Sequence, residues 1–197
     1  MSRVLAKIRR MRGAEFLPIW TGMMAAMMLP STVPLLRLDY ATTRSAVRAA
    51  ALAGGYLLVW IAFGGVVLAI DAVAGERLLG MHGRRLTAAL LALAALYQLL
   101  PMKQRCLRRC RAPLGRLLLG WRDGVAGSAR MGVTNGLWCA GCCVSLMVAL
   151  LALGVMSWGW MILVGAVILV EKVAPFGARL ARPLSVVLAV GAIVWAL

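Results

Sequence analysis

The feature that most restricts the fold of this chain is an uncharged stretch of forty residues, Met131 to Val170. A single helix crosses the roughly 30 Å hydrocarbon core of a bilayer with about 20 apolar residues. The stretch is long enough for two such helices, and we expect it to turn back at "GVMSWGW", Gly154 to Trp160. A water-soluble domain of this size cannot bury so long an apolar segment. The sequence therefore predicts a membrane protein.

Four further uncharged runs support this interpretation: Phe16 to Leu36, Ala49 to Ile70, Leu86 to Met102 and the shorter Pro183 to Leu197. Hydrophobic residues make up 63% of the chain and charged residues 14%, a balance far from that of soluble domains. We predict an all-α fold, a polytopic transmembrane helical bundle of about six spans, in the cell (inner or plasma) membrane. Residues 1–197 are expected to form a single transmembrane domain, with a basic amino-terminal tail over 1–14 and a basic, cysteine-bearing loop over 103–130.

The chain has 22 basic and 6 acidic residues, for a net charge of +16. In a membrane protein such an excess orients the helices and binds anionic lipid headgroups, and no nucleic-acid-binding motif accompanies it. The basic residues divide 14 to 8 between the two sides when the loop over 103–130 is placed in the cytoplasm, so both termini are predicted to be external. No segment is long enough for a soluble catalytic domain, and we expect a binding function rather than an enzyme.

All five cysteines occur in two short motifs, "CLRRC" and "CAGCC". Cys106 and Cys110 are spaced i, i+4 and would share one side of a helix. Cys139 and Cys143 repeat that spacing, with Cys142 between them. The loop that joins the two motifs places both towards the same side of the membrane. Arginines beside "CLRRC" favour thiolate over thiol, and thiolates bind soft metals.

The first predicted span adds thioethers in the segment "MMAAMM". Met24 and Met28 are one helical turn apart, as are Met23 and Met27 on the adjacent face. Thiolates and thioethers together favour Cu(I), and zinc on four cysteines is the alternative. Singly, such residues are usually packing, but their clustering predicts a site. The predicted metal ligands are Cys106, Cys110, Cys139, Cys142, Cys143, Met24, Met27 and Met28.

Three further expectations concern packing. Gly132 and Gly136 form a small-residue step that would let another helix approach closely. Glu171 and Lys172, at the end of an apolar run, are either interface anchors or a functional ion pair facing the bundle. Aromatic residues near predicted helix ends are expected to anchor the protein at the membrane interface; these are Trp20, Tyr56, Trp60, Tyr97, Trp121, Trp138, Trp158 and Trp160.

These motifs resemble a family of bacterial and archaeal integral membrane proteins, described as predicted metal-binding proteins with a domain of unknown function. The matching stretches are "WTGMMAAMMLPSTVPLL" (Trp20 to Leu36), "LYQLLPMKQRCLRRCRAPL" (Leu96 to Leu114), "GLWCAGCCVSLMVALLALGVM" (Gly136 to Met156) and "EK" (Glu171 and Lys172). The resemblance implies six or seven helices and a metal site, with copper the usual assignment, on the five cysteines and Met24, Met27 and Met28. The family often has a histidine where this chain has Asn135, and its absence favours an all-sulfur site.

Three functions fit these observations. The leading hypothesis is a membrane protein that binds Cu(I) through the Cys/Met cluster, for copper transport or for delivery to a cuproenzyme. The second is a structural or accessory subunit of a larger membrane complex. The third is a membrane thiol-disulfide oxidoreductase, with Cys139 and Cys142 as the redox pair and Cys106 and Cys110 as the resolving pair. The expected partners are the bilayer and its anionic lipids, other membrane subunits, or the cuproenzyme.

Overall fold

The structure, a computed structural model, describes residues 13–80, 83–112, 123–153, 158–174 and 177–197. Within these ranges it contains helices and no strand, so the predicted all-α class is confirmed. The elements are α2 (Gly13–Met28), η1 (Leu29–Thr32), α3 (Val33–Thr43), α4 (Ala46–Gly80), α5 (Gly83–Leu99), α6 (Pro101–Cys110), α8 (Gly124–Leu153), α9 (Trp158–Val173), η2 (Gly177–Leu180) and α10 (Ala181–Ala196). Residues 1–12 of the predicted tail, 113–122 of the predicted loop and 154–157 of the predicted turn lie outside the described residues.

The first predicted span is a continuous helical run through α2, η1 and α3. Pro30 lacks a backbone donor, and around it the helix tightens to the 3-10 form of η1, because proline interrupts the regular i to i−4 hydrogen bonds. The run ends at Arg44, whose backbone is left-handed with φ 51° and whose N–H donates to the carbonyl of Tyr40. This left-handed cap terminates α3 and lets the chain turn into α4.

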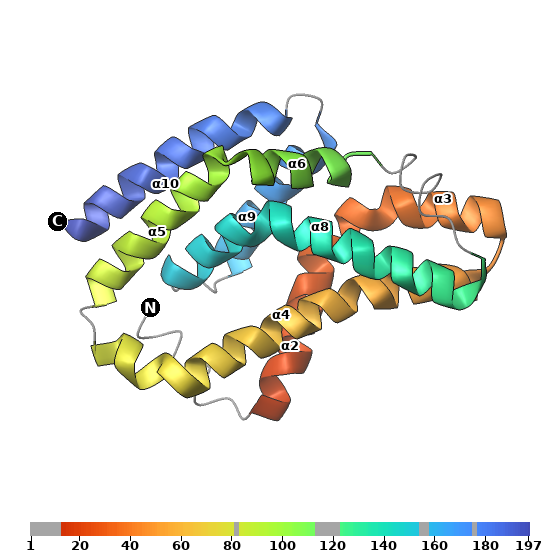
Figure 1. Cartoon of the computed structure of the whole chain (residues 1–197), viewed down its shortest axis with the longest axis horizontal. Helices are drawn as coiled ribbons and strands as arrows, with labels where there is room; N and C mark the ends of the chain where they lie inside the picture. Colours follow the sequence, from red (N-terminus) through yellow and green to blue (C-terminus); the bar gives the residue numbers. More distant parts are fainter. Residues whose placement is uncertain (1–12, 81–82, 113–122, 154–157, 175–176) are drawn as a thin grey trace.

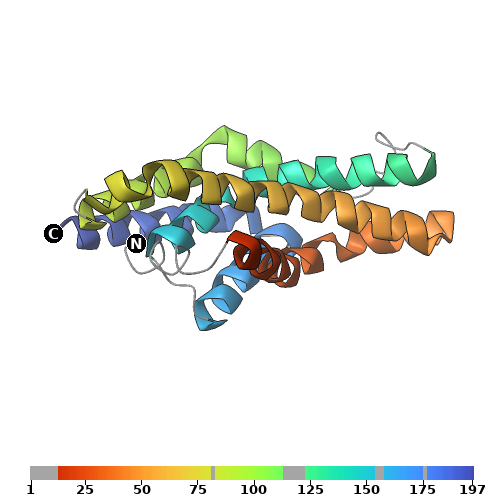
Figure 2. The ribbon, with the colours of Figure 1, turned by 90° about the horizontal axis from the view of Figure 1, so that it is seen from below.

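The two long helices, α4 and α8, lie side by side (Figures 1 and 2). Glycine makes this close approach possible: a Cβ built on Gly132 would collide with the carbonyl oxygen of Leu52. A Cβ on Gly136 would lie 2.8 Å from Cγ2 of Val59. The predicted small-residue step is thus confirmed as a helix contact, and its partner is α4.

Helix α5 stops at Leu99 because Pro101 follows. The residue before a proline avoids the helical region, and Leu100 is extended, with ψ 140°. Pro101 then opens α6, which leaves α5 at an angle of 65°. The segment predicted as a loop over 103–130 therefore begins as a helix. Cys106 and Cys110 both belong to α6, so their i, i+4 spacing does place them on related sides of one helix.

The remaining helices, α9 and α10, pack on different partners. α10 packs along α5, where Oγ of Ser185 donates to the carbonyl of Ala95 at 3.0 Å. Oγ of Thr87, also on α5, donates to the carbonyl of Ala152 on α8 at 3.3 Å. α9 contacts α2, η1, α6 and α8, which places it beside both cysteine-bearing helices.

Three helical segments of the described chain are long and apolar enough to cross a membrane: Glu15–Thr43, Ala46–Ile70 and Gly124–Leu153. The bent pair α5 and α6 would make a fourth. The described residues therefore contain three or four candidate spans, fewer than the predicted six. α9 and α10 have 16 residues each, and about 24 Å of helix is shorter than a bilayer core.

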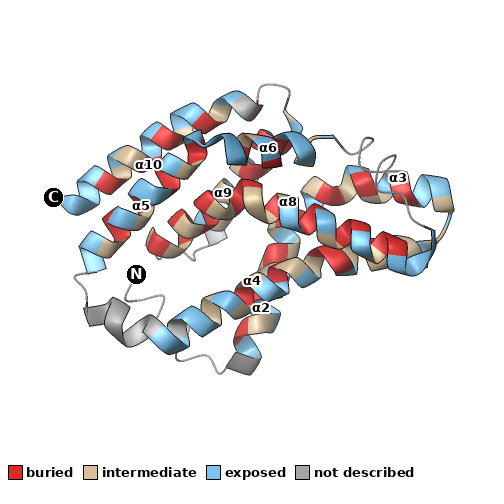
Figure 3. Ribbon diagram, in the orientation of Figure 1, coloured by how far each residue is buried: buried red, intermediate tan, exposed pale blue. Residues whose placement is uncertain are grey.

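The surface of the bundle is apolar over most of its helices. Large exposed hydrophobic residues include Leu58 on α4, Leu96 on α5, Ile162 on α9 and Val190 on α10, each more than half exposed. Figure 3 shows exposed and buried stretches alternating along these helices. An exposed apolar surface of this extent is typical of a protein that contacts lipid or other apolar partners.

The interior contains several aromatic residues that we expected at the membrane interface. Trp20, Tyr56 and Trp60 are 2%, 0% and 0% exposed, and Nε1 of Trp20 donates to the carbonyl of Trp60 at 2.9 Å. The interface prediction is wrong for these three, because they lie where α2 packs against α4. Trp160, at the start of α9, is half-exposed, and Trp121 lies outside the described residues.

Candidate metal centre

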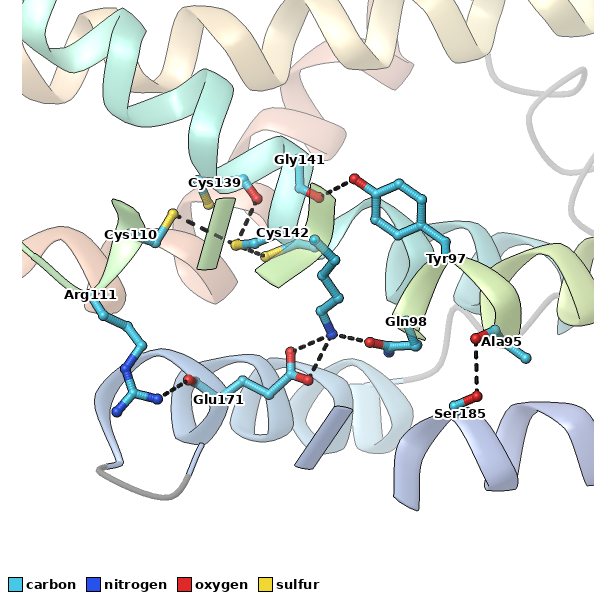
Figure 4. A network of polar contacts seen from close by, with 12 residues as sticks. Ala95, Tyr97, Gln98, Cys110, Arg111, Cys139, Gly141, Cys142, Glu171 and Ser185 are labelled. Carbon is cyan, nitrogen blue, oxygen red and sulfur yellow. Dashed lines mark hydrogen bonds and ion pairs between the residues drawn. The ribbon is translucent and has the colours of Figure 1, made fainter. Parts of the chain in front are cut away.

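The cysteines of α6 and α8 meet in the core of the bundle (Figure 4). The sulfur of Cys142 lies 3.5 Å from that of Cys143 and 3.7 Å from that of Cys110. Cys142 and Cys143 are neighbours on α8, whereas Cys110 ends α6, 32 positions earlier in the chain. Cys142 and Cys143 are each 1% exposed, and Cys110 is half-buried. The structure thus places three of the predicted ligands next to one another.

The sulfur separations at Cys142 match those between ligands of a single metal ion. In a tetrahedral thiolate site, metal–sulfur bonds of about 2.3 Å place neighbouring sulfurs roughly 3.8 Å apart. None of the five cysteines is in a disulfide. Among the described residues, no group of three or more His, Cys, Asp or Glu side chains is arranged so that it could hold a metal ion. Cys142 thus forms two close sulfur pairs, one with Cys143 and one with Cys110. We call these three cysteines an open trio, because their sulfurs do not form a closed metal cage.

Cys139, one helical turn before Cys142 and Cys143, is held by polar groups. Nζ of Lys172, from α9, lies 2.8 Å from its sulfur, and Oη of Tyr56, from α4, lies 2.9 Å from it. Lys172 also donates to Oγ of Ser31 at 3.3 Å. An ammonium at hydrogen-bond distance stabilises the negative charge of a thiolate, and the thiolate is the form that binds metal.

Cys106 occupies the other side of the cysteine motif on α8. A Cβ on Gly141 would lie 2.8 Å from the Cys106 sulfur, so the glycine of "CAGCC" leaves the room in which α6 packs. Oη of Tyr97 donates to the carbonyl of Gly141 at 2.6 Å and joins α5 to the same turn of α8. Cys106 is buried, but its sulfur lies over Gly141 and outside the close pairs of Cys142.

The predicted methionine ligands separate into two groups. Met24 and Met28 are fully buried and belong to the same core cluster as Cys139, Cys142 and Cys143. Met27 is only partly buried: it packs against the edge of the same cluster and contacts α9, where a Cβ on Gly165 would lie 3.6 Å from its Cε. The structure therefore places Met24 and Met28 in the core that holds the thiols, and Met27 against a neighbouring helix.

A buried ion pair joins the start of α6 to α9 (Figure 4). Nζ of Lys103 lies 2.8 Å and 3.1 Å from the two carboxylate oxygens of Glu171 on α9, and it also donates to Oε1 of Gln98. Lys103 and Gln98 are 0% exposed and Glu171 is 2% exposed. The prediction that Lys103 belongs to a basic surface loop is wrong, because Pro101 starts a helix that turns this side chain inward.

A second cation joins the other end of α6 to α9. The guanidinium of Arg111 donates to the carbonyl oxygens of Glu171, at 3.2 Å, and Ala174, at 2.5 Å. These are carbonyls at the end of α9, where a positive charge is favourable. Arg111 and Lys103 therefore fix α6 to α9 on both sides of Cys106 and bring Cys110 to a defined position.

Of the two roles predicted for Glu171 and Lys172, interface anchoring is wrong, whereas the position facing the bundle is confirmed, with partners other than each other. Both are buried, which excludes interface anchoring, and each has a partner elsewhere: Glu171 pairs with Lys103, and Lys172 contacts Cys139. Charged residues buried between apolar helices are rare and often functional. The sequence signal for Lys103 and Tyr56 was weak, since a basic run and a lone tyrosine do not reveal contacts 68 and 83 positions away.

The comparisons with known proteins bear on this sulfur-rich core. The chain matches the model of a family named PpoB2, described as a copper chaperone, over residues 17–195. Searches of curated proteins and of solved structures found no match. The matched range contains the methionine segment of α2, both cysteine motifs and the buried charges of α9. Because the match extends over nearly the whole sequence, the chain belongs to the PpoB2 copper chaperone family.

Proposed function

We propose that this chain is a membrane copper chaperone that holds Cu(I) at Cys142 and delivers it to a cuproenzyme. The observation that carries the proposal is the position of the Cys142 sulfur, within 3.7 Å of one sulfur on its own helix and one on α6. Membership of a copper chaperone family supports copper as the cargo.

The chemistry of the donors favours Cu(I) over other metals. Thiolates and thioethers prefer this soft ion, whereas Mg²⁺ and Ca²⁺ require oxygen ligands. The carboxylate of Glu171, which lies near the cysteines, is engaged by Lys103. Zinc on thiolates is the remaining alternative, but the open trio around Cys142 suits the low coordination number of a transferable ion better than a closed four-ligand site.

The buried thioethers extend the soft donor set. Met24 and Met28 share the core cluster of the cysteines, and in this proposal they pass Cu(I) towards Cys142 by exchange between sulfur ligands. Lys172 compensates the negative charge of the thiolates, because a buried anion without a counter-ion is strongly destabilised. Met27 contacts α9, and we assign it to packing.

The apolar surface supports a membrane location. The candidate spans Glu15–Thr43, Ala46–Ile70 and Gly124–Leu153 together with the exposed hydrophobic residues of α5 and α10 suit a lipid environment. The external position of both termini, expected from the distribution of basic residues, stays a prediction.

Anaerobic Cu(I) titration of the full-length protein in lipid nanodiscs, in competition with a chromogenic Cu(I) chelator, tests this function. The wild type is expected to bind Cu(I) tightly, and Cys142→Ser to weaken binding by about 10- to 100-fold or more. Cys106→Ser is the matched control, because it removes one buried thiol outside the close pairs. Equal affinities of wild type and Cys142→Ser would refute the site, and a preference for Zn²⁺ would refute the cargo.

The separation of Cys110 and Cys142 also favours a second candidate, thiol-disulfide exchange. Their sulfurs are 3.7 Å apart, and this pair joins two helices, unlike the redox pairs that the sequence predicted. Such an oxidoreductase should tolerate Met24→Leu/Met28→Leu, whereas copper handling should not. If copper removal instead dissociated the protein from co-purifying membrane subunits, the accessory-subunit hypothesis would be favoured.

A further inference from the structure

We propose that the exposed arginine face of α6 is the docking surface for an acidic copper-acceptor protein, and that Cys110 is the ligand through which copper leaves. This inference rests on the proposed copper-carrying function. It adds the exit route and the chemistry of the partner.

The five cysteines differ in their access to the surface. Cys106, Cys139, Cys142 and Cys143 are 1% to 4% exposed, whereas Cys110 is half-buried. Its sulfur is 3.7 Å from that of Cys142, so it links the buried thiols to the outside. An acceptor ligand must contact the metal or one of its ligands before transfer, and Cys110 is the cysteine that an incoming protein reaches first.

The surface of α6 next to Cys110 is cationic. Arg105, Arg108 and Arg109 are exposed and spaced i, i+3 and i+4, so they share one face of the helix. The guanidinium of Arg109 lies 4.8 Å from the ring centroid of Trp138, which holds this edge of the face against α8.

The bend of the chain separates this face from the apolar surface of α5. α6 leaves α5 at 65°, and Lys103 and Arg111 fix it to α9 from within the bundle. The arginine face therefore presents Cys110 on a rigid support. Rigid presentation favours docking, because little side-chain or backbone freedom is lost when a partner binds.

Charge complementarity specifies the partner. The exposed Arg105 and Arg108, one helical turn apart on α6, attract an acidic protein, and such a cationic surface can raise its association rate by about 10- to 1,000-fold at low salt. Anionic lipid headgroups are attracted by the same charges, but the arginine face is next to the one cysteine from which copper can be taken. This position favours an acceptor protein whose copper-binding thiols are surrounded by acidic residues.

The transfer step balances as a ligand exchange. A first acceptor thiol loses its proton and bonds to Cu(I) while the bond from Cu(I) to Cys143 breaks, and a second acceptor thiol does the same while the bond to Cys142 breaks. The bond to Cys110 breaks last and leaves Cu(I) on the two acceptor sulfurs. Two of the three released cysteines take up the protons that the acceptor thiols gave up, and the third takes up a proton from water. Copper remains Cu(I) throughout, so no oxidant or reductant is consumed.

Stopped-flow transfer from the Cu(I)-loaded full-length protein, in nanodiscs of neutral phosphatidylcholine, tests the proposal. The probes are two dithiol peptides that differ only in having glutamates or serines around the cysteines. We expect transfer to the glutamate peptide to be about 10-fold or more faster at low salt, with the difference lost near 1 M salt, where the Debye length is about 3 Å. Arg105→Glu/Arg108→Glu should abolish the preference, whereas Arg84→Glu/Arg85→Glu, with the same charge change at exposed positions of α5, should preserve it.

Cys110→Ser tests the exit ligand separately. It should slow transfer to both peptides while leaving Cu(I) bound at Cys142 and Cys143. Equal rates for the two peptides in wild type would overturn the docking surface. If Arg105→Glu/Arg108→Glu lost binding to anionic vesicles but transferred copper as the wild type does, the arginine face would be a lipid anchor. That result would also overturn the docking surface. Failure of the wild type to load Cu(I) would instead refute the underlying copper function.

Discussion

The buried ion pair between Lys103 and Glu171 gives the sharpest prediction about stability. Lys103 is 0% exposed and contacts both carboxylate oxygens of Glu171, whose side chain is 3% exposed. Lys103→Met leaves that carboxylate buried without its counter-ion, which costs about 3–5 kcal/mol. For a chain of this length each kcal/mol corresponds to about 2–4 °C in Tm. We therefore expect Tm to fall by roughly 6–20 °C.

The assay is thermal unfolding of the full-length protein in detergent micelles, followed by far-ultraviolet circular dichroism. Lys103→Met/Glu171→Met should recover most of the loss, because replacing both members of a buried pair by apolar residues is often neutral. Arg105→Met, at an exposed position of the same helix, is the control and should change stability by less than about 0.5 kcal/mol. A Tm for Lys103→Met within about 2 °C of the wild type, or a double variant no more stable than the single, would refute this reasoning.

Three further predictions follow from other contacts. Gly132→Ala should lower Tm, because the added methyl group collides with Leu52 at an overpacking cost of about 1–3 kcal/mol. Gly54→Ala is the control and should be neutral or stabilising, because open space surrounds Gly54. Equal effects of the two substitutions would contradict the close α4–α8 packing. Asp39→Asn should raise Tm, because the fully buried Asp39 carboxylate has no hydrogen-bond partner within the described part of the chain; a lower Tm would mean that the carboxylate has a stabilising partner. Gly141→Ala should displace Cys106 and weaken Cu(I) binding in chelator competition. Gly141→Ala/Cys106→Ala should restore Cu(I) binding. If the double variant bound Cu(I) as weakly as Gly141→Ala, the methyl group added at position 141 would act on another part of the protein.

The parts of the fold that depend on local patterns were predictable from the sequence. Uncharged apolar runs indicated the helices, and the small-residue step at Gly132 and Gly136 indicated a close helix contact, since spacing along one helix determines its face. The number of candidate spans was harder to predict from the sequence. It depends on where Pro101 breaks the third run and on the length of α9 and α10, which apolar composition alone does not fix.

The candidate site was predictable in its residue types but only partly in its contacts. The two cysteine motifs identified the soft donors, yet the sequence did not show that Cys110 approaches Cys142 while Cys106 packs on Gly141. The charged and polar partners were missed for the same reason. Lys103 meets Glu171 and Tyr56 meets Cys139 only through packing between helices distant in the chain, and a buried lysine in a basic run looks like any surface cation.

Copper K-edge X-ray absorption of the anaerobically Cu(I)-loaded protein tests the central claim most directly, because it reports the atoms bound to the metal. The account predicts an all-sulfur first shell in the wild type. In Cys142→Ser that shell should be lost or altered, whereas in Cys106→Ser it should be unchanged. Nitrogen or oxygen ligands in the wild type, or an identical sulfur shell in Cys142→Ser, would contradict a copper site centred on Cys142.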